Sequence, residues 1–140
     1  MTRRTAWFLH LSTLLVGVSG LVFAWMLYVL EPTDPYALVS HARQPDVQHL
    51  HVLTAPLLVF GCGILWTGHI WARIRSGHQG RRRTGIALTA LLAPMILSGY
   101  LLQVSVDESM RELWIVTHVA TSCLWLLVYA VHQFSPRQSG

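Results

Sequence analysis

The chain has 140 residues, of which 53% are hydrophobic and only 11% are charged. Soluble domains carry about 25% charged residues, so this composition excludes an ordinary soluble domain and indicates an integral membrane protein. The net charge of +4 comes from arginines concentrated in the N-terminal tail and in one loop, residues 73–83. This is the pattern of cytoplasmic membrane loops, so no nucleic-acid partner is predicted.

Four apolar segments predict four membrane-spanning helices, at about 6–30, 48–72, 84–106 and 112–134. Each is near the ~20 residues that cross a ~30 Å hydrocarbon core. Backbone groups in lipid must be satisfied within the segment, which leaves helices at this length. The expected fold class is therefore all-α, an integral membrane four-helix bundle forming a single domain over 1–140. The basic tail and loop place both termini in the cytoplasm.

Several residues inside these segments modify the helices. Pro56 and Pro94 fall in the second and third segments, where membrane bundles tolerate prolines as kinks. Glycines such as Gly20 allow close approach of a neighbouring helix or of a flat cofactor. Cys62 and Cys123 lie in apolar runs without a CxxC or CxxCH pattern, so neither structural zinc nor covalently attached haem is predicted. No internal repeat is evident.

Eight histidines are unusual in so apolar a chain, because intramembrane ionisable groups are costly and tend to be functional. His41 and His78 fall in loops and are expected to be solvated. The others form two levels: His49, His51 and His118 near the outer helix ends, and His10, His69 and His132 near the inner ends. Two such levels are typical of two stacked haem groups, each with two axial imidazoles.

The fourth segment carries the clearest spacing. His118 and His132 are fourteen residues apart, a rotation of ~1400°, which is ~40° short of four turns, and a rise of ~21 Å. They therefore share one face and supply one imidazole to each level. At the outer level, His49 and His51 differ by ~200°, so only one faces the haem. His51 is favoured, because Ala55 one turn below leaves room for a porphyrin.

At the inner level, His10 and His69 compete as the partner of His132. The rise from His51 to His69 is ~27 Å, about 6 Å more than the rise between the two histidines of the fourth segment. This mismatch favours His10 and keeps His69 as the alternative.

Three stretches carry a family resemblance: 6-AWFLHLSTLLVGVSGL-21 with its Ser19-Gly20-Leu21 element, the third-segment ending PMILSGYLL, and the His118/His132 pair. They resemble the bacterial membrane-bound di-haem cytochrome b superfamily, which includes formate dehydrogenase gamma subunits and the cytochrome b subunits of nickel–iron hydrogenase. The resemblance implies the pairs His10–His132 and His51–His118 as axial ligands of two haem b groups. It also implies a multi-pass protein of a bacterial-type inner membrane.

The function implied by the resemblance is transmembrane electron transfer between a membrane quinone and a redox partner, either a periplasmic cytochrome or a catalytic subunit. His69, Trp71 and Arg73 are candidates for a quinone site near the inner haem. Any enzymatic role is expected only as the electron-transfer subunit of a quinone-linked oxidoreductase, surrounded by membrane lipid. The alternatives are a mono-haem protein and a haem-free structural, assembly or metal-handling subunit.

Overall fold

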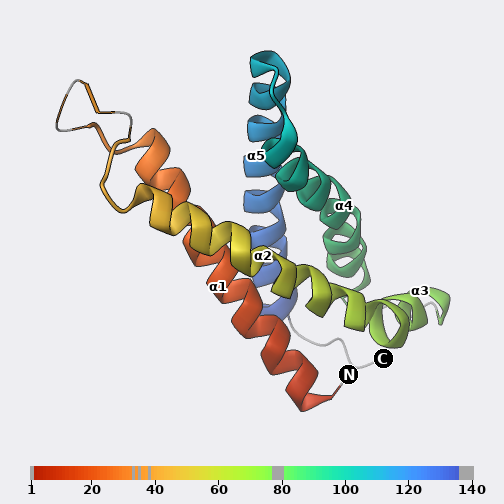
Figure 1. Cartoon of the computed structure of the whole chain (residues 1–140). Coiled ribbons are helices and arrows are strands. Elements are labelled where there is room, and N and C mark those ends of the chain that lie inside the picture. The colour runs from red at the N-terminus through yellow and green to blue at the C-terminus, as the bar shows by residue number, and fades with distance from the viewer. Residues whose placement is uncertain (1, 33, 35, 38, 77–80, 136–140) are drawn as a thin grey trace. The chain divides into compact units, whose positions relative to one another are not determined.

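The computed structural model describes residues 2–32, 34, 36–37, 39–76 and 81–135, apart from the side chain of Thr67. His78 lies outside these residues. The described part is helical and has no strand: α1 (Arg3–Tyr28), α2 (Gln44–Leu65), the π-helix η1 (Trp66–Trp71), α3 (Ala72–Arg75), α4 (Arg82–Val104) and α5 (Glu108–Phe134) (Figure 1).

Four helices are long and apolar enough to cross a membrane, because α2, η1 and α3 follow one another as a single span, Gln44–Arg75. This confirms the four predicted helical segments and the all-α fold class. It is what a multi-pass membrane protein requires. The π-helix was not predicted, because a single extra residue in a helical turn leaves no mark in a hydropathy pattern.

The helices begin a few residues before the predicted starts, because their first turns are polar, and α1 and α5 are also capped by a side chain. The Thr2 side-chain oxygen accepts a hydrogen bond from the Thr5 backbone N–H and starts α1 at Arg3. Asp107 does the same for α5 through the Met110 N–H. Hydrogen bonds from the Ser109 hydroxyl and the Met110 N–H hold the pKa of the Asp107 carboxyl below its usual value.

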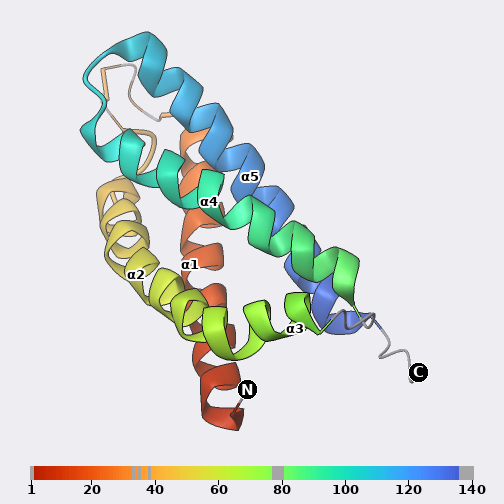
Figure 2. The ribbon, with the colours of Figure 1, turned by 90° about the vertical axis from the view of Figure 1, so that its right-hand side faces the viewer.

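The chain forms two compact units, Met1–Gly68 and His69–Gly140. In the first unit α1 packs along α2, and in the second α4 packs along α5 (Figure 2). The hydrophobic residues buried in these contacts are Leu9, Val16, Met26, Leu58, Cys62, Leu65, Met95 and Trp125. Each unit is therefore a helical hairpin with its own buried seam, and this seam positions the histidines described below.

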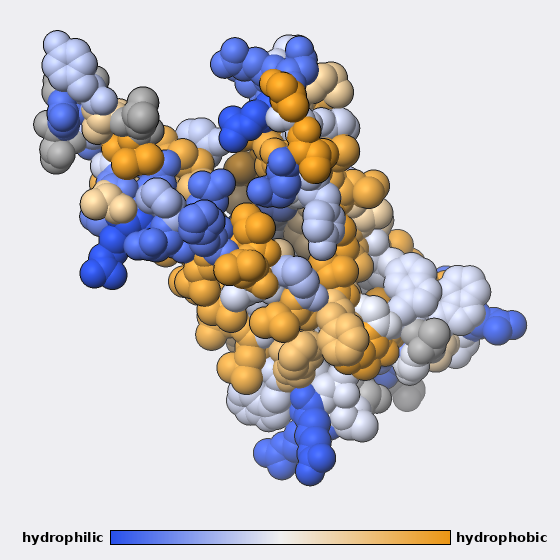
Figure 3. Space-filling view, viewed as in Figure 1, coloured by the Kyte–Doolittle hydropathy of each residue, from blue (hydrophilic) through white to orange (hydrophobic). Residues whose placement is uncertain are grey.

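Most apolar side chains lie outside these seams. Only 6% of the apolar window of α4, and the same share of α5, is buried. Hydrophobic side chains cover the helices, and hydrophilic ones gather at helix ends and in the loop after α1 (Figure 3). So large an exposed apolar surface requires lipid or protein partners, as a membrane-embedded chain has.

Trp125 anchors the α4–α5 seam. Its side chain is 4% exposed, its indole N–H donates to the Leu88 carbonyl at 3.2 Å, and its ring stacks on Tyr129 at 5.2 Å. We expect Trp125→Phe to lower the free energy of unfolding by about 1 kcal/mol, since interhelical hydrogen bonds in membranes contribute about 0.6–1.7 kcal/mol. SDS titration of the purified protein measures this. Trp25→Phe, at a half-exposed position, is the control. An equal effect of both substitutions would contradict the anchoring role.

Candidate functional site

His51 on α2 lies with its ring against α1. Its Nδ1 is 3.1 Å from the carbonyl oxygen of Val16 and 3.2 Å from Oγ of Ser19. A carbonyl oxygen only accepts, and the Ser19 hydroxyl already donates to Val16, so Nδ1 carries the proton. A Cβ added at Gly20 would lie 2.7 Å from Cε1 of this ring. The imidazole therefore occupies space that a glycine alone leaves open.

His118 on α5 repeats this arrangement against α4. Its Nδ1 is 3.0 Å from the carbonyl oxygen of Met95 and 3.3 Å from Oγ of Ser98. The Ser98 hydroxyl donates to Pro94, so the imidazole proton again lies on Nδ1. A Cβ at Gly99 would lie 3.0 Å from Cε1 of His118. Each hairpin thus holds one imidazole against a serine, the glycine that follows it, and the carbonyl three residues before the serine.

His132 has a third version of the same contact near the start of α4. Its Nδ1 is 2.8 Å from Oγ1 of Thr84, and the Thr84 hydroxyl donates to the Arg81 carbonyl at 3.0 Å. His132 is therefore the donor to Thr84. A Cβ at Gly85 would lie 3.7 Å from Cε1 of His132, an ordinary contact distance. We call each such Ser/Thr-Gly dipeptide beside a histidine a hydroxyl–glycine pair.

The two hydroxyl–glycine pairs of α4 match the two histidines of α5 in spacing. Ser98-Gly99 and Thr84-Gly85 are fourteen residues apart, as are His118 and His132. Both intervals correspond to a rise of ~21 Å along the helix. The α4–α5 hairpin therefore presents two imidazoles in the same manner at two depths. The spacing of the two histidines on α5 is thus matched by the spacing of their partners on α4.

The remaining candidate histidines differ in their surroundings. His49 is exposed on α2, whereas His51 contacts α1. His10 is half-buried on α1, edge-on to Trp7 with 6.3 Å between ring centroids. His69 lies in the π-helix η1.

The π-helix changes the comparison between His10 and His69. Its hydrogen bonds close over five residues instead of four, so it holds more residues per turn and advances less per residue. The ~27 Å rise from His51 to His69 assumed an uninterrupted α-helix. The true rise is shorter, and the mismatch that favoured His10 is smaller. Such π turns also occur frequently at functional sites.

The helix partners of the histidines were only partly visible in the sequence. Ser19-Gly20 and the serine and glycine of PMILSGYLL stood out as motifs, but their contact with imidazole rings did not. Thr84 and Gly85 were missed. The signal that finds them is the recurrence of Ser/Thr-Gly on the third segment at the spacing of the two histidines on the fourth. The carbonyl partners carry no sequence signal.

The donor chemistry of these histidines fits a haem iron. A proton on Nδ1 leaves the lone pair on Nε2, the nitrogen through which an imidazole ligates haem. A hydrogen bond from the other ring nitrogen to a carbonyl or hydroxyl is what orients ligating histidines and raises their basicity. His51, His118 and His132 all have this bond and lie on helices with apolar surroundings. The structure fits haem ligation by imidazole.

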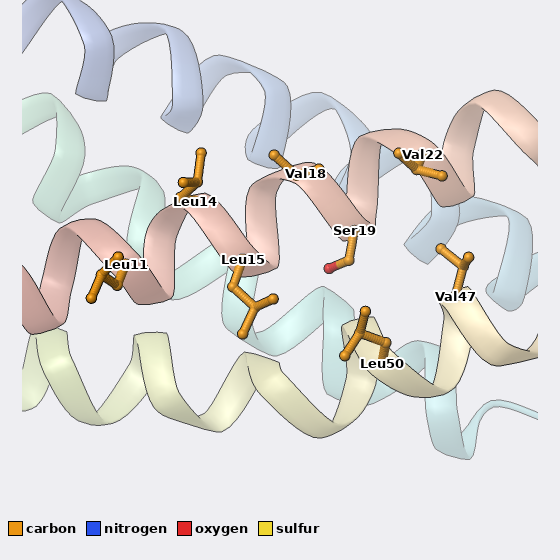
Figure 4. A pocket seen from close by; sticks show the side chains of 8 residues that line it. All are labelled: Leu11, Leu14, Leu15, Val18, Ser19, Val22, Val47 and Leu50. Atoms are coloured by element: carbon orange, nitrogen blue, oxygen red, sulfur yellow. The ribbon is translucent and has the colours of Figure 1, made fainter.

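A groove of about 630 Å³ lies on the α1–α2 hairpin, within the usual range of small-molecule sites. Leu15 and Ser19 of α1 point toward α2 there, and Leu50 of α2 points back (Figure 4). Its lining is Leu11, Leu14, Leu15, Val18, Ser19, Val22, Val47 and Leu50. Ser19, which fixes His51, is the polar member of an apolar lining.

Over the described ranges, no group of three or more His, Cys, Asp or Glu side chains is arranged to hold a metal ion. The chain matches no protein-family model, no curated protein and no solved structure. The geometry of the histidines is therefore the basis for the functional argument.

Proposed function

We propose that this chain is a membrane cytochrome b subunit that transfers electrons across the bilayer through two haem b groups. The observation that carries the proposal is the set of three imidazoles with protonated Nδ1, each beside a hydroxyl–glycine pair on the neighbouring helix. A structural histidine needs no such repeated arrangement. Three similar imidazoles supply three of the four axial ligands that two bis-imidazole sites require.

The outer site takes His51 and His118 as axial ligands. Each hairpin contributes one of them, and the two have the same set of partners: a serine, the following glycine and a carbonyl. Equivalent surroundings suit two ligands of one iron. At the inner site His132 is one ligand, and His10 or His69 is the other.

When bound, a bis-imidazole haem takes up and releases single electrons and has no open coordination position for a substrate. The protein's own residues hold the ligand geometry. The Val16 carbonyl binds Nδ1 of His51 directly, and the Met95 carbonyl binds that of His118. The Arg81 carbonyl acts on His132 through the Thr84 hydroxyl. These bonds fix the Nδ1 proton and the orientation of each ring. The apolar helices exclude water and favour electron transfer without proton uptake at the imidazoles.

The partners follow from the resemblance and from the charge distribution. A quinone or quinol exchanges electrons at one side, and a periplasmic cytochrome or catalytic redox subunit does so at the other, in a bacterial-type inner membrane with both termini cytoplasmic. His69, Trp71 and Arg73 follow one another through η1 into α3 and remain the proposed inner quinone contact. The chain then acts within a quinone-linked oxidoreductase and carries no separate catalytic site.

Electron transfer across a bilayer tests this function directly. We expect proteoliposomes with ferricyanide trapped inside and a reduced quinol analogue outside to reduce the ferricyanide only when the protein is present. His132→Ala liposomes are the matched control and should lose this activity. Haem-containing liposomes that show no internal ferricyanide reduction would refute the transmembrane function, and haem-free protein would support the structural or metal-handling alternatives.

A further inference from the structure

Arg81 distinguishes the end of the α4–α5 hairpin that holds His132 from the end that holds His118. It is the N-cap of α4 and has φ 56°, a left-handed conformation that is uncommon for a residue with a side chain. Its guanidinium donates to the carbonyl oxygen of Gln133 at 3.2 Å and to that of Ser135. A positive charge thus lies at the C-terminal end of α5, where the helix dipole favours it.

The backbone carbonyl of Arg81 is also connected to His132, through the side chain of Thr84. The Arg81 carbonyl accepts the Thr84 hydroxyl at 3.0 Å, and Thr84 accepts the Nδ1 proton of His132 at 2.8 Å. Arg81 therefore acts on both sides of His132. Its carbonyl fixes the Thr84 hydroxyl that binds the His132 ring, and its guanidinium binds the carbonyl of the next residue, Gln133. These contacts on both sides maintain the unusual backbone angle of Arg81.

A fixed positive charge lies at the His132 end of the hairpin. The guanidinium of Arg81 stays protonated at every physiological pH. It binds the carbonyl oxygen of Gln133, the residue that follows His132 in α5. The charge is therefore near the residues that would hold a haem at this end.

We propose that the positive charge of Arg81 raises the reduction potential of the haem held by His132. This inference rests on the proposed function. Reduction adds one electron to the haem and neither forms nor breaks a bond, so a nearby fixed positive charge stabilises the reduced form.

A spectroelectrochemical titration of the purified full chain tests the inference. In Arg81→Gln the side chain still donates hydrogen bonds but has no charge, so we expect the midpoint potential of one haem to fall and that of the other to stay unchanged. The component that falls should be the one absent from His132→Ala. Arg81→Lys, which keeps the charge, should retain the wild-type potentials. Arg83→Gln, at an exposed position two residues away, is the control for loss of a positive charge in this region.

Equal shifts in Arg81→Gln and Arg81→Lys would overturn the inference, because they would show that the helix cap matters and the charge does not. Unchanged potentials in Arg81→Gln would overturn it as well. If Arg81→Gln fails to retain the His132 haem, Gln133→Glu gives the second measurement, since a carboxylate beside the intact Arg81 should lower the same midpoint. If Arg81→Gln binds two haems with unaltered potentials, this inference is refuted and the proposed function stands. If the wild-type protein binds no haem, the proposed function itself is refuted.

Discussion

Gly20→Ala should remove the haem held by His51 and His118, leaving about one haem per chain. The added Cβ would lie 2.7 Å from Cε1 of His51, closer than non-bonded carbon atoms approach. The ring has little freedom to move, because its Nδ1 is bound to the Val16 carbonyl and the Ser19 hydroxyl. Displacing it by a few tenths of an ångström breaks these bonds and turns Nε2 away from the position of the iron. Haem per chain and the reduced-minus-oxidised spectrum measure the effect.

The other glycines turn this prediction into a graded series. At Gly99 the added Cβ would lie 3.0 Å from His118, so we expect a weakened site with partial loss of the same haem. At Gly85 the distance to His132 is 3.7 Å, and Gly85→Ala should retain both haems. Gly63→Ala, with nothing within 4 Å, is the matched control on α2. Equal haem content in all four variants would contradict the role of the glycines as space for the imidazoles.

His118→Ala and His132→Ala should each remove a different haem. The two residues lie ~21 Å apart on one face of α5, so each serves one level only. We expect one remaining haem in each variant, with distinct alpha-band positions and midpoint potentials, and no haem in the double variant. Loss of the same spectral component from both variants would contradict the two-level arrangement.

The same experiment identifies the inner partner. The shortened rise across η1 leads us to expect that His69→Ala removes the haem that His132→Ala removes. His10→Ala should then retain it. The reverse result assigns the ligand to His10, as the family resemblance implies. His49→Ala, at an exposed position, is the control and should keep both haems.

The sequence was sufficient for the fold because membrane-spanning helices are specified by length and hydrophobicity alone. All four segments appear as helices, with starts displaced toward caps such as Thr2 and Asp107. The spacing of His118 and His132 predicts two haem levels, and the preference for His51 over His49 rests on rotation about the helix axis; both stay predictions.

Other features depend on contacts that no hydropathy pattern records. The π-helix at Trp66–Trp71 alters both rise and rotation before His69, so distances counted along an ideal α-helix were too long. Glycines were expected to let a neighbouring helix or a flat cofactor approach closely, but the sequence did not show that imidazole rings lie beside Gly20 and Gly99. The left-handed backbone of Arg81 and its two bonds to the end of α5 follow from tertiary structure, since residues fifty positions apart must meet.

The presence of two haem b groups is the central claim, and haem quantified per chain in the purified wild-type protein tests it most directly. The protein should be produced with adequate haem supply and examined by a dithionite-reduced minus oxidised absorption spectrum. We predict a sharp b-type alpha band and about two haems per chain, released without covalent attachment. A preparation that is folded and helical but contains no haem would contradict the account.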